Sequence, residues 1–169
     1  MIIWISGPYG VGKSTLAEAL AEKMEHALIF DAEEMGNAVR ENYPNCPYGV
    51  IFEDYPLWSK FCYELLKDIH NTFGKNILVP MTMLRRSTYG NIIEKLLADN
   101  IDTRLVVLEA GYQSVHDRIL ARGEEEGCWC MENIELARRE SSAIREGLHL
   151  DTDGRSVEEL AEMVLSYIS

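Results

Sequence analysis

The sequence predicts an α/β domain of three layers, in which a five-stranded parallel sheet carries helices on both faces. Short apolar runs alternate with amphipathic helical patterns along the 169 residues. Such runs are typical of strands that are buried on both faces, and the helices between them supply right-handed crossovers. The length suits one hydrophobic core, so a single domain over residues 1–169 is expected.

The first part of the chain alternates twice between strand and helix. The apolar run at 2–5 ends in a glycine-rich turn, and from Lys13 onward leucines and alanines recur at helical spacing. A second apolar run at 27–30 precedes a helix over about 33–40. Pro and Gly interrupt residues 41–56, so this segment is expected to be irregular and to cover a bound acceptor.

The middle of the chain holds the clearest helical pattern. Apolar residues recur over 58–73 at intervals of three and four, so this stripe is expected to face the core. Its members are Trp58, Phe61, Cys62, Leu65, Leu66, Ile69 and Phe73. An apolar run at 77–80 predicts the third strand, and the spacing of apolar residues at 92–97 predicts another helix.

The remaining residues repeat the alternation. A strand at 105–108 leads into a helix over 112–122, and the acidic, glycine-containing stretch 123–130 predicts a loop. A helix over about 132–146 follows. The last two elements are a strand and a helix, at residues 148–150 and 157–168.

Charge and composition exclude several classes of function. The chain has 16 Lys and Arg against 28 Asp and Glu, a net charge of −12, which repels nucleic acids and anionic membranes. Apolar runs are shorter than a membrane span needs, and a cytoplasmic protein is expected. The cysteine spacing matches no zinc finger, although Cys128 and Cys130 leave a metal or redox role open.

A phosphate-binding motif follows the first predicted strand. Gly7-Pro8-Tyr9-Gly10-Val11-Gly12-Lys13-Ser14 matches G-x-x-x-x-G-K-[ST], and Thr15 comes next. The glycines allow backbone N–H groups to surround an anion, the lysine reaches the β and γ phosphates, and the serine hydroxyl binds Mg²⁺. The motif therefore predicts ATP and Mg²⁺ as cofactors within a P-loop NTPase fold, and its glycine spacing resembles the small kinases of the adenylate-kinase-like group.

Five further segments resemble the tunicamycin-resistance-protein family in their order and spacing. They are Ile2–Ile5, Phe30–Gly36, Asp54–Trp58, Val79–Thr82 and Leu150–Gly154. The resemblance spans nearly the whole chain. It implies a P-loop domain of the nucleotide-kinase kind, with ATP as phosphoryl donor and a nucleoside-like antibiotic as candidate acceptor.

Asp31 is the first candidate for the acceptor side of the site. It follows the second strand, at the edge of the sheet where open α/β folds bind ligands. The resemblance to small kinases implies a base or a substrate-binding acid at this place, and the alternative is an N-cap of the next helix. The third strand ends at Pro80 and has no Walker B aspartate. Asp31 and, as the weaker candidate, Glu109 are expected to hold Mg²⁺ through water in place of that acid, and Thr82 is a candidate for a hydrogen bond to substrate.

Arginines are candidates for stabilising the transferred phosphoryl group. Arg118 and Arg122 lie on one face of a predicted helix, and Arg138 follows the acidic loop, so residues 118–138 resemble the lid of small kinases. The alternative is surface pairing, for example of Arg138 with a nearby glutamate. Arg85 is a candidate for gripping an anionic acceptor. Tyr55 belongs to an aromatic cluster that is expected to contact the acceptor, and core packing is the alternative for its member Trp58.

Three functions are compatible with these residues. The first is an ATP- and Mg²⁺-dependent phosphotransferase that acts on a nucleoside, a nucleotide or a nucleoside-like antibiotic such as tunicamycin. The second is a nucleotide-dependent protein that protects by sequestering its ligand, which the absent Walker B acid favours. The third is a kinase of a small hydroxylated metabolite, similar to shikimate or gluconate kinases. All three bind ATP and a small molecule.

Overall fold

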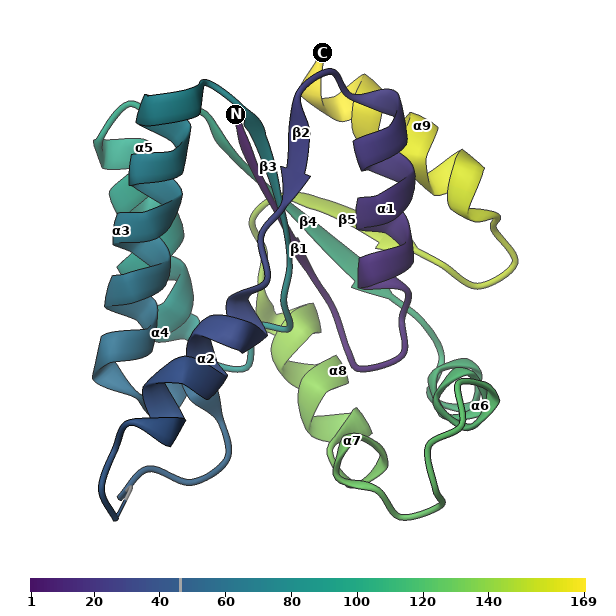
Figure 1. The fold of residues 1–169 in the computed structure, drawn as a ribbon. Coiled ribbons are helices and arrows are strands. Elements are labelled where there is room, and N and C mark those ends of the chain that lie inside the picture. Colours follow the sequence, from purple (N-terminus) through teal and green to yellow (C-terminus); the bar gives the residue numbers. More distant parts are fainter. Residues whose placement is uncertain (46) are drawn as a thin grey trace.

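The structure is a computed structural model that describes residues 1–45 and 47–169. Its sheet has five strands: β1 Ile2–Ser6, β2 Ala27–Ile29, β3 Asn76–Pro80, β4 Thr103–Glu109 and β5 Leu148–Asp151. In space they follow the order β2, β3, β1, β4, β5, and every pairing is parallel (Figure 1). The register places Trp4 between Val79 of β3 and Leu105 of β4. The predicted fold class is confirmed.

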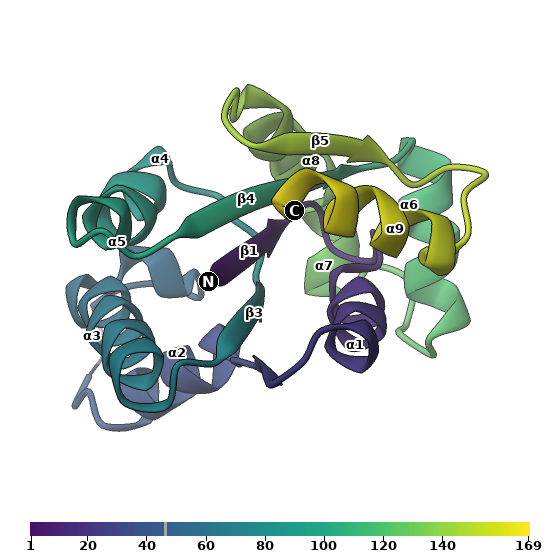
Figure 2. The same ribbon diagram turned by 90° about the horizontal axis from the view of Figure 1, so that it is seen from above.

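Helices cover both faces of this sheet. Their bounds are α1 Lys13–Lys23, α2 Ala32–Glu41, α3 Pro56–Phe73, α4 Arg86–Thr88, α5 Lys95–Ala98, α6 Tyr112–Ala121, α7 Trp129–Glu132, α8 Ile134–Ala143 and α9 Val157–Ile168. Seen from above, α1, α6 and α9 lie on one side of the sheet, and α3, α4 and α5 lie on the other (Figure 2). Within the described ranges, no helix has both the length and the apolar character that a membrane span requires.

The strands serve two separate cores, because successive side chains of a strand point to opposite faces. Ile2 and Trp4 pack with α3 and α5, whereas Ile3 and Ile5 pack with α1 and α9. The indole N–H of Trp4 donates to the Met81 carbonyl at 3.0 Å, which satisfies a polar group inside the first core. β1, β3 and β4 are therefore buried on both faces, as their continuous hydrophobic runs predict, whereas β2 at the edge of the sheet leaves Ile29 exposed.

Local signals in the sequence set several helix ends. Pro56 begins α3, where its missing N–H costs no hydrogen bond, and Gly74 ends the helix with φ of 60°, a conformation that glycine adopts without strain. The predicted core stripe of this helix is confirmed for the fully buried Trp58, Cys62 and Leu66. It is wrong for Phe61, Leu65 and Phe73, which are exposed by 48%, 37% and 64%. Ser156 begins α9 with a capping box closed by Glu159.

Two stretches differ from their predicted form. The helix expected around 92–97 is α4 followed by a π-helical segment, Tyr89–Glu94, and by α5. The loop expected over 123–130 ends early, because α7 already begins at Trp129. Asn133 separates α7 from α8, and its side chain donates to the Trp129 carbonyl at 2.8 Å, so the single helix predicted over 132–146 is divided. In segment 41–56 only Phe52–Asp54 forms a short 3-10 helix before α3, and Cys46 lies outside the described residues.

Candidate functional site

The phosphate loop joins the end of β1 to the start of α1. Gly7, Gly10 and Gly12 all have positive φ, at 146°, 78° and 105°. A side chain at Gly7 would place its Cβ 2.6 Å from the Leu108 carbonyl oxygen, so the loop passes β4 at a distance that only glycine permits. The N–H groups of the first turn of α1 and the positive end of the helix dipole point towards this loop, and such an arrangement binds phosphate.

Lys13 bends back over this loop. Its ammonium donates to the Pro8 carbonyl at 2.9 Å and to the Gly7 carbonyl at 3.2 Å. The protein packed around the side chain lowers the pKa of Lys13 to about 8, and the nearby Glu33 works in the opposite direction. Ser14 and Thr15 follow with exposed side chains at the first turn of α1. The loop therefore presents one cation and two hydroxyls at the helix terminus.

Two hollows meet at the phosphate loop. The first, of about 420 Å³, runs along the start of α1 towards Arg118, Thr152 and Arg155. The second, of about 670 Å³, extends the other way to α2, the 3-10 turn and α7. Gly10, Lys13, Ser14 and Arg122 line both hollows. We call the first the nucleotide hollow and the second the acceptor cavity, since a phosphate on the loop lies between them.

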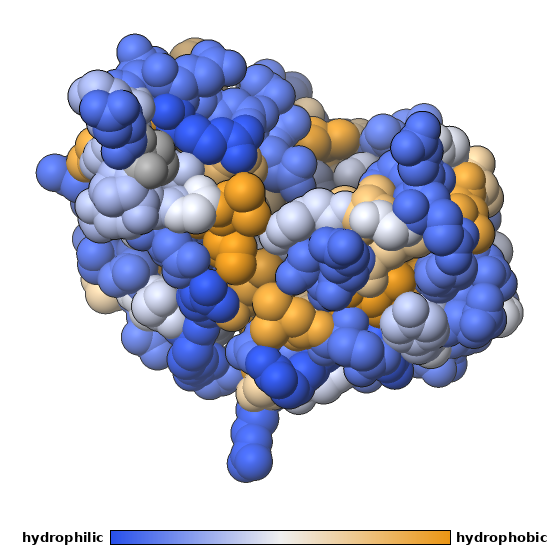
Figure 3. Space-filling view, turned by 90° about the horizontal axis from the view of Figure 1, so that it is seen from below, coloured by the Kyte–Doolittle hydropathy of each residue, from blue (hydrophilic) through white to orange (hydrophobic). Residues whose placement is uncertain are grey.

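The acceptor cavity has walls of mixed chemistry. Seen from below, hydrophobic side chains gather in the middle of the face, between hydrophilic parts on either side (Figure 3). Apolar and aromatic residues of the cavity are Tyr9, Val50, Ile51, Phe52, Met81, Leu84 and Trp129. Charged residues of the cavity are Lys13, Glu33, Arg40, Glu53, Arg122 and Glu124. The cavity therefore suits a ligand with a flat or apolar part and several polar groups.

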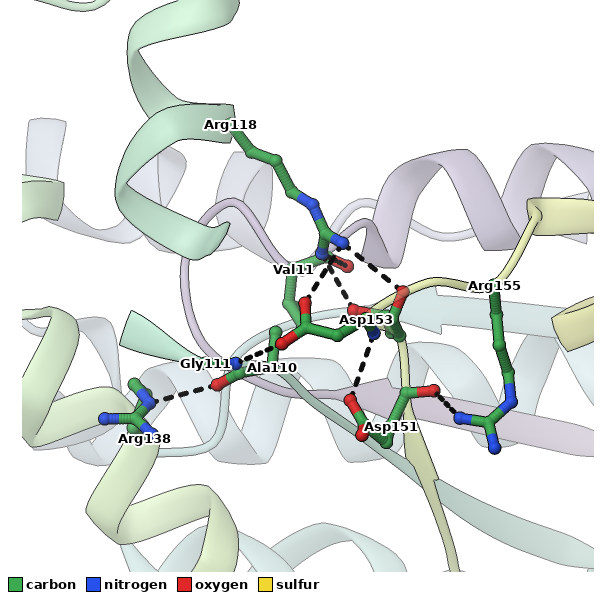
Figure 4. A network of polar contacts seen from close by, with 9 residues as sticks. Val11, Ala110, Gly111, Arg118, Arg138, Asp151, Asp153 and Arg155 are labelled. Carbon is green, nitrogen blue, oxygen red and sulfur yellow. Dashed lines mark hydrogen bonds and ion pairs between the residues drawn. The ribbon is translucent and has the colours of Figure 1, made fainter. Parts of the chain in front are cut away.

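Arg118 connects the phosphate loop to the loop after β5 (Figure 4). Its guanidinium donates to the Thr152 hydroxyl at 2.8 Å and reaches the Val11 carbonyl at 3.4 Å. It also pairs with Asp153 at 3.4 Å, and the same carboxylate accepts the Gly111 N–H at 2.7 Å. These contacts make Arg118 part of the wall of the nucleotide hollow.

The three predicted lid arginines do not come together. Arg122 pairs with Glu124 in the acidic loop and lines both hollows. Arg138 instead donates to the Ala110 carbonyl at 3.1 Å and to Glu135 at 2.8 Å, which is the surface pairing that the sequence left open. It lines a third hollow of about 260 Å³ that lacks Lys13. Arg138 therefore lines neither the nucleotide hollow nor the acceptor cavity, and the expectation for it is corrected, because its guanidinium is bonded at the end of β4. The lid roles of Arg118 and Arg122, which line the nucleotide hollow, stay a prediction.

Two residues predicted to bind the acceptor are occupied elsewhere. Tyr55 is 1% exposed and its hydroxyl donates to the Gly49 carbonyl at 3.0 Å, so it packs in the core under segment 41–56. Arg85 forms a two-point ion pair with Asp54, at 2.9 and 3.0 Å, and is absent from the lining of the acceptor cavity. Both expectations are corrected, since neither side chain faces that cavity.

Asp31 and Thr82 lie at the strand ends, as expected. Asp31 is the N-cap of α2, and one carboxylate oxygen accepts the N–H groups of Glu33 and Glu34 at 2.9 and 3.1 Å. It also lines a smaller hollow with Ser14 and Glu33. Thr82 is 3% exposed, borders the acceptor cavity and donates to the Gly7 carbonyl at 2.9 Å. Thr82 therefore holds the phosphate loop against the end of β3.

Comparison with known proteins gives the family of the chain. The family model described as an AAA domain matches residues 3–140. The chain belongs to this family. Comparison with functionally curated proteins finds no match.

Solved structures resemble this AAA domain over nearly its whole length. The tunicamycin resistance protein of Deinococcus radiodurans has a TM-score of 0.80 and 24% identity, with 99% of this chain and 95% of that chain covered. The APS kinase CysC of Mycobacterium tuberculosis, solved with AMPPNP and APS, has a TM-score of 0.69 and 16% identity, covering 99% and 96%. A gluconokinase from Sinorhizobium meliloti 1021 has a TM-score of 0.69 and 17% identity, covering 97% and 89%. The predicted P-loop fold is confirmed, and the resemblance to the tunicamycin-resistance family is confirmed at the level of the fold.

Sequence reasoning missed three charged residues of the acceptor cavity. In the sequence Glu33 is a common type of first-turn helix residue, yet it lines the cavity near Lys13. Arg40 ends α2 and its guanidinium lies 4.9 Å from the centre of the Phe52 ring. Glu53 lies in the irregular segment, where no periodicity marks it. The spacing of residues in the sequence does not mark Arg40 or Glu53 as site residues, because their contacts come from other segments of the chain.

The residues near Ser14 fit a magnesium ion held together with phosphates. Ser14 and Asp31 line one small hollow beside the phosphate loop, and together they offer a hydroxyl and a carboxylate. Mg²⁺ prefers such oxygen ligands and usually takes only one or two protein groups beside phosphates and waters. In the ranges 1–45 and 47–169, no three His, Cys, Asp or Glu side chains are placed to hold a metal by themselves. The donor set therefore suits a metal that arrives with the nucleotide.

Glu53 joins the 3-10 turn to the segment after β3. Its carboxylate accepts the Leu84 N–H at 2.7 Å, the Arg85 N–H at 3.1 Å and the Thr88 hydroxyl at 2.5 Å. Burial raises the pKa of Glu53 to about 7, against the opposing effect of these hydrogen bonds. The carboxyl group thus fixes Leu84 on the wall of the acceptor cavity.

A pH-dependent stability follows from Glu53. Because its pKa in the folded protein lies above its ordinary value, the folded state holds this proton more tightly, and its contribution is lost as the pH rises from about 4.5 through 7. We expect the unfolding free energy of the wild type, relative to that of Glu53→Gln, to fall by on the order of 2 kcal/mol between about pH 5 and pH 8. The melting temperatures of the two proteins over this pH range measure the effect. Exposed Glu41→Gln is the control, and a pH-independent difference between wild type and Glu53→Gln would contradict the assignment.

Proposed function

We propose that this protein is an ATP- and Mg²⁺-dependent phosphotransferase whose acceptor is a nucleoside, a nucleotide or a nucleoside-like antibiotic such as tunicamycin. The observation that carries the proposal is the meeting of two hollows at Lys13 and Ser14. A triphosphate on the loop with its base in the nucleotide hollow directs its terminal phosphate towards the acceptor cavity. Donor and acceptor then approach each other at a place that provides a cation and a helix terminus.

The nucleotide hollow supports ATP as the donor. Its polar side offers the loop N–H groups, the Ser14 and Thr15 hydroxyls and the guanidinium of Arg118. Its outer part adds Val157 and Leu160, which give an apolar surface beside Arg155. A purine ring fits between such a guanidinium and an aliphatic wall, because both contact flat π systems favourably.

The acceptor cavity supports a nucleoside-like ligand. Tyr9 and Trp129 meet edge to face at 5.1 Å between ring centres, and Phe52 lies under the Arg40 guanidinium on the other wall. These groups offer surfaces for a flat ring, whereas Arg40 suits an anionic or strongly polar substituent. Segment 41–56 covers this side of the site, and residues 118–138 contribute Arg122, Glu124 and Trp129 to the facing wall.

Glu33 is the proposed base for the acceptor hydroxyl. The protein around it raises its pKa, and the nearby Lys13 ammonium partly opposes this effect. The acceptor oxygen attacks the γ-phosphorus, its proton passes to the Glu33 carboxylate, and the bond to the bridging oxygen breaks with its electron pair leaving on ADP. Lys13 and Arg122 stabilise the charge that develops on the transferred group. Mg²⁺, when bound beside Ser14, neutralises phosphate charge.

The test is ADP formation from Mg-ATP with a panel of nucleosides, nucleoside monophosphates, tunicamycin and small hydroxylated metabolites. Acceptor-dependent ADP with a nucleoside-like compound, together with a phosphorylated product by mass spectrometry, supports the proposal. Saturation only by a sugar acid or similar metabolite would replace the acceptor class with that of a small-metabolite kinase.

A second candidate is nucleotide-dependent sequestration of a ligand without chemistry. The favouring observation is the end of β3, where Pro80, Met81 and Thr82 stand in place of an acid. Calorimetry with ATP and each compound distinguishes the two functions. Tight binding of a nucleoside-like compound, with neither ADP nor a phosphorylated product, would favour sequestration over phosphotransfer.

A further inference from the structure

Gly36 lies buried in the middle of α2, in contact with the ring of Phe52. A Cβ atom at this position would come within 2.3, 2.4 and 2.6 Å of the Cγ, Cδ1 and Cδ2 atoms of that ring. Three distances so similar place the Cβ over the face of the ring and not over its edge. The ring therefore packs with its face on the backbone of α2. Glycine is less favourable than alanine inside a helix, and this close approach gives a physical reason for glycine here.

The Phe52 ring separates Gly36 from the acceptor cavity. Phe52 and Arg40 line the cavity, whereas Gly36 does not. Arg40 stands four residues after Gly36, on the same side of the helix, and its guanidinium lies 4.9 Å from the centre of the ring. The ring and the guanidinium thus form one patch of the cavity surface, which we call the Phe52–Arg40 wall.

The turn that carries Phe52 is fixed on both sides of the ring. The Glu53 carboxylate accepts two backbone N–H groups of the segment after β3, at 2.7 and 3.1 Å. Tyr55 is 1% exposed, and its hydroxyl donates to the Gly49 carbonyl at 3.0 Å. Because these contacts hold the backbone of the turn, a methyl group at position 36 must displace the ring itself. The open side of the ring is the acceptor cavity, so the ring would move into the space of the ligand.

Arg40 faces the cavity without a carboxylate partner. Its Nη2 donates to the side-chain oxygen of Asn37 at 2.8 Å. Within residues 1–45 and 47–169 it forms no ion pair, whereas Arg122, the other arginine of the cavity, pairs with Glu124. In a chain with a net charge of −12, acids to pair with an arginine are abundant. An arginine left unpaired in a cavity therefore indicates an anionic ligand.

We propose that Gly36 is a specificity-determining residue, because it lets the Phe52–Arg40 wall bind an acceptor that has a flat ring and an anionic group. The ring of the acceptor packs on Phe52, and its anion pairs with Arg40. The acceptor class is thereby narrowed from nucleosides in general to flat anions such as nucleoside monophosphates. This inference rests on the proposed function for the role of the ligand, but it concerns binding and can be tested without turnover.

Calorimetry in the presence of AMPPNP tests the anionic class, because the analogue fills the nucleotide hollow and leaves the acceptor cavity open. The probes are uridine 5′-monophosphate and its neutral counterpart uridine. The monophosphate is expected to bind at least about tenfold more tightly, through a charge-assisted contact with Arg40. Arg40→Met is expected to abolish this preference. Arg145→Met is the matched control, since Arg145 is exposed and lines neither the nucleotide hollow nor the acceptor cavity.

Gly36→Ala tests the packing under the wall. A bound ligand must force the ring back against the added methyl group, so the affinity for the monophosphate is expected to fall on the order of ten- to a hundredfold. The affinity for AMPPNP is expected to stay unchanged, which a general loss of structure would not allow. Gly90→Ala is the matched control in the π-helical segment Tyr89–Glu94, where an added Cβ would meet only the end of the Glu94 side chain, at 3.3 Å.

Phe52→Ala shows whether the ring is what the methyl group meets. In the wild type, Gly36→Ala is expected to lower the melting temperature by a few degrees. In the Phe52→Ala background the same substitution is expected to raise it by roughly 2 to 4 °C, because the higher helix propensity of alanine then acts alone. An equal fall in both backgrounds would overturn the contact between Gly36 and the ring.

The outcomes separate this inference from the proposed function. Uridine monophosphate that binds no better than uridine, or that does not bind, would overturn the anionic class, and unchanged binding in Gly36→Ala would overturn the role of that residue. Binding that depends on Arg40, without ADP formation, would support the inference and reject phosphotransfer. Wild-type ADP formation with a neutral acceptor in Arg40→Met would do the reverse.

Discussion

Replacing Lys13 with alanine is expected to reduce acceptor-dependent ADP formation by roughly 10³-fold or more, since a phosphate-bound cation is worth several kcal/mol in phosphoryl transfer. Lys13 lines both the nucleotide hollow and the acceptor cavity, and it belongs to the phosphate loop itself. Its loss therefore removes charge stabilisation at the transferred group. Steady-state kinetics with Mg-ATP and an accepted nucleoside measure the effect.

The same variant is expected to keep its fold. Burial lowers the pKa of Lys13 to about 8, so its ammonium costs stability in the folded state. Removing that charge leaves the melting temperature unchanged or raises it. Lys23→Ala is the matched control at the other end of α1, where the lysine pairs with Glu162 on the surface and touches neither hollow. Near-normal turnover in Lys13→Ala would reject the phosphate assignment.

Glu33→Gln is expected to lower kcat by about 10² to 10⁴-fold with little change in the KM for ATP, because a positioned general base contributes about that much. The amide keeps the size of the side chain and its place at the start of α2. It has no lone pair basic enough to take the proton from the acceptor hydroxyl. A pH profile of kcat supplies a second measurement, since the acidic limb belongs to the base and should disappear in Glu33→Gln.

Asp31→Asn distinguishes the role of Asp31 from that of Glu33, the other carboxylate at the start of α2. Asparagine caps a helix about as well as aspartate, so α2 is retained and only the charge is lost. Asp31 shares its hollow with Ser14, and we expect this variant to raise the Mg²⁺ concentration required for half-maximal activity, with a smaller loss of kcat. If Asp31→Asn lowers kcat more than Glu33→Gln does, the base is Asp31 and not Glu33.

Much of the fold could be predicted from the sequence alone. The apolar runs at β1, β3 and β4 predict strands buried on both faces, and the structure places them at the centre of the sheet. The stripe of α3 predicts its buried side only in part: Trp58 and Cys62 are buried, whereas Phe61 and Phe73 of the same stripe are exposed. The division between α7 and α8 was missed because Asn133 has no unusual propensity and acts through one hydrogen bond to Trp129.

Side-chain pairing explains the corrected site residues. Arg85 and Tyr55 have the chemistry to bind a ligand, but Asp54 and the Gly49 carbonyl take up their polar groups. Asp54 lies 31 residues from Arg85, a separation at which no local pattern exists. Glu53 was missed for the same reason, since its partners Leu84 and Thr88 lie on a different segment.

The sequence by itself determined the alternation of strands and helices, the phosphate loop and the caps of its helices, because each depends on residues within a few positions of one another. Only the tertiary structure decided the order of the strands, which acids and arginines face the acceptor cavity, and which face of α3 remains exposed. Those features depend on contacts between distant segments, and a contact of that kind is set by how the elements pack in three dimensions. The residues that bind phosphate could therefore be predicted from the sequence, whereas the residues that face the acceptor cavity were identified only from the tertiary structure.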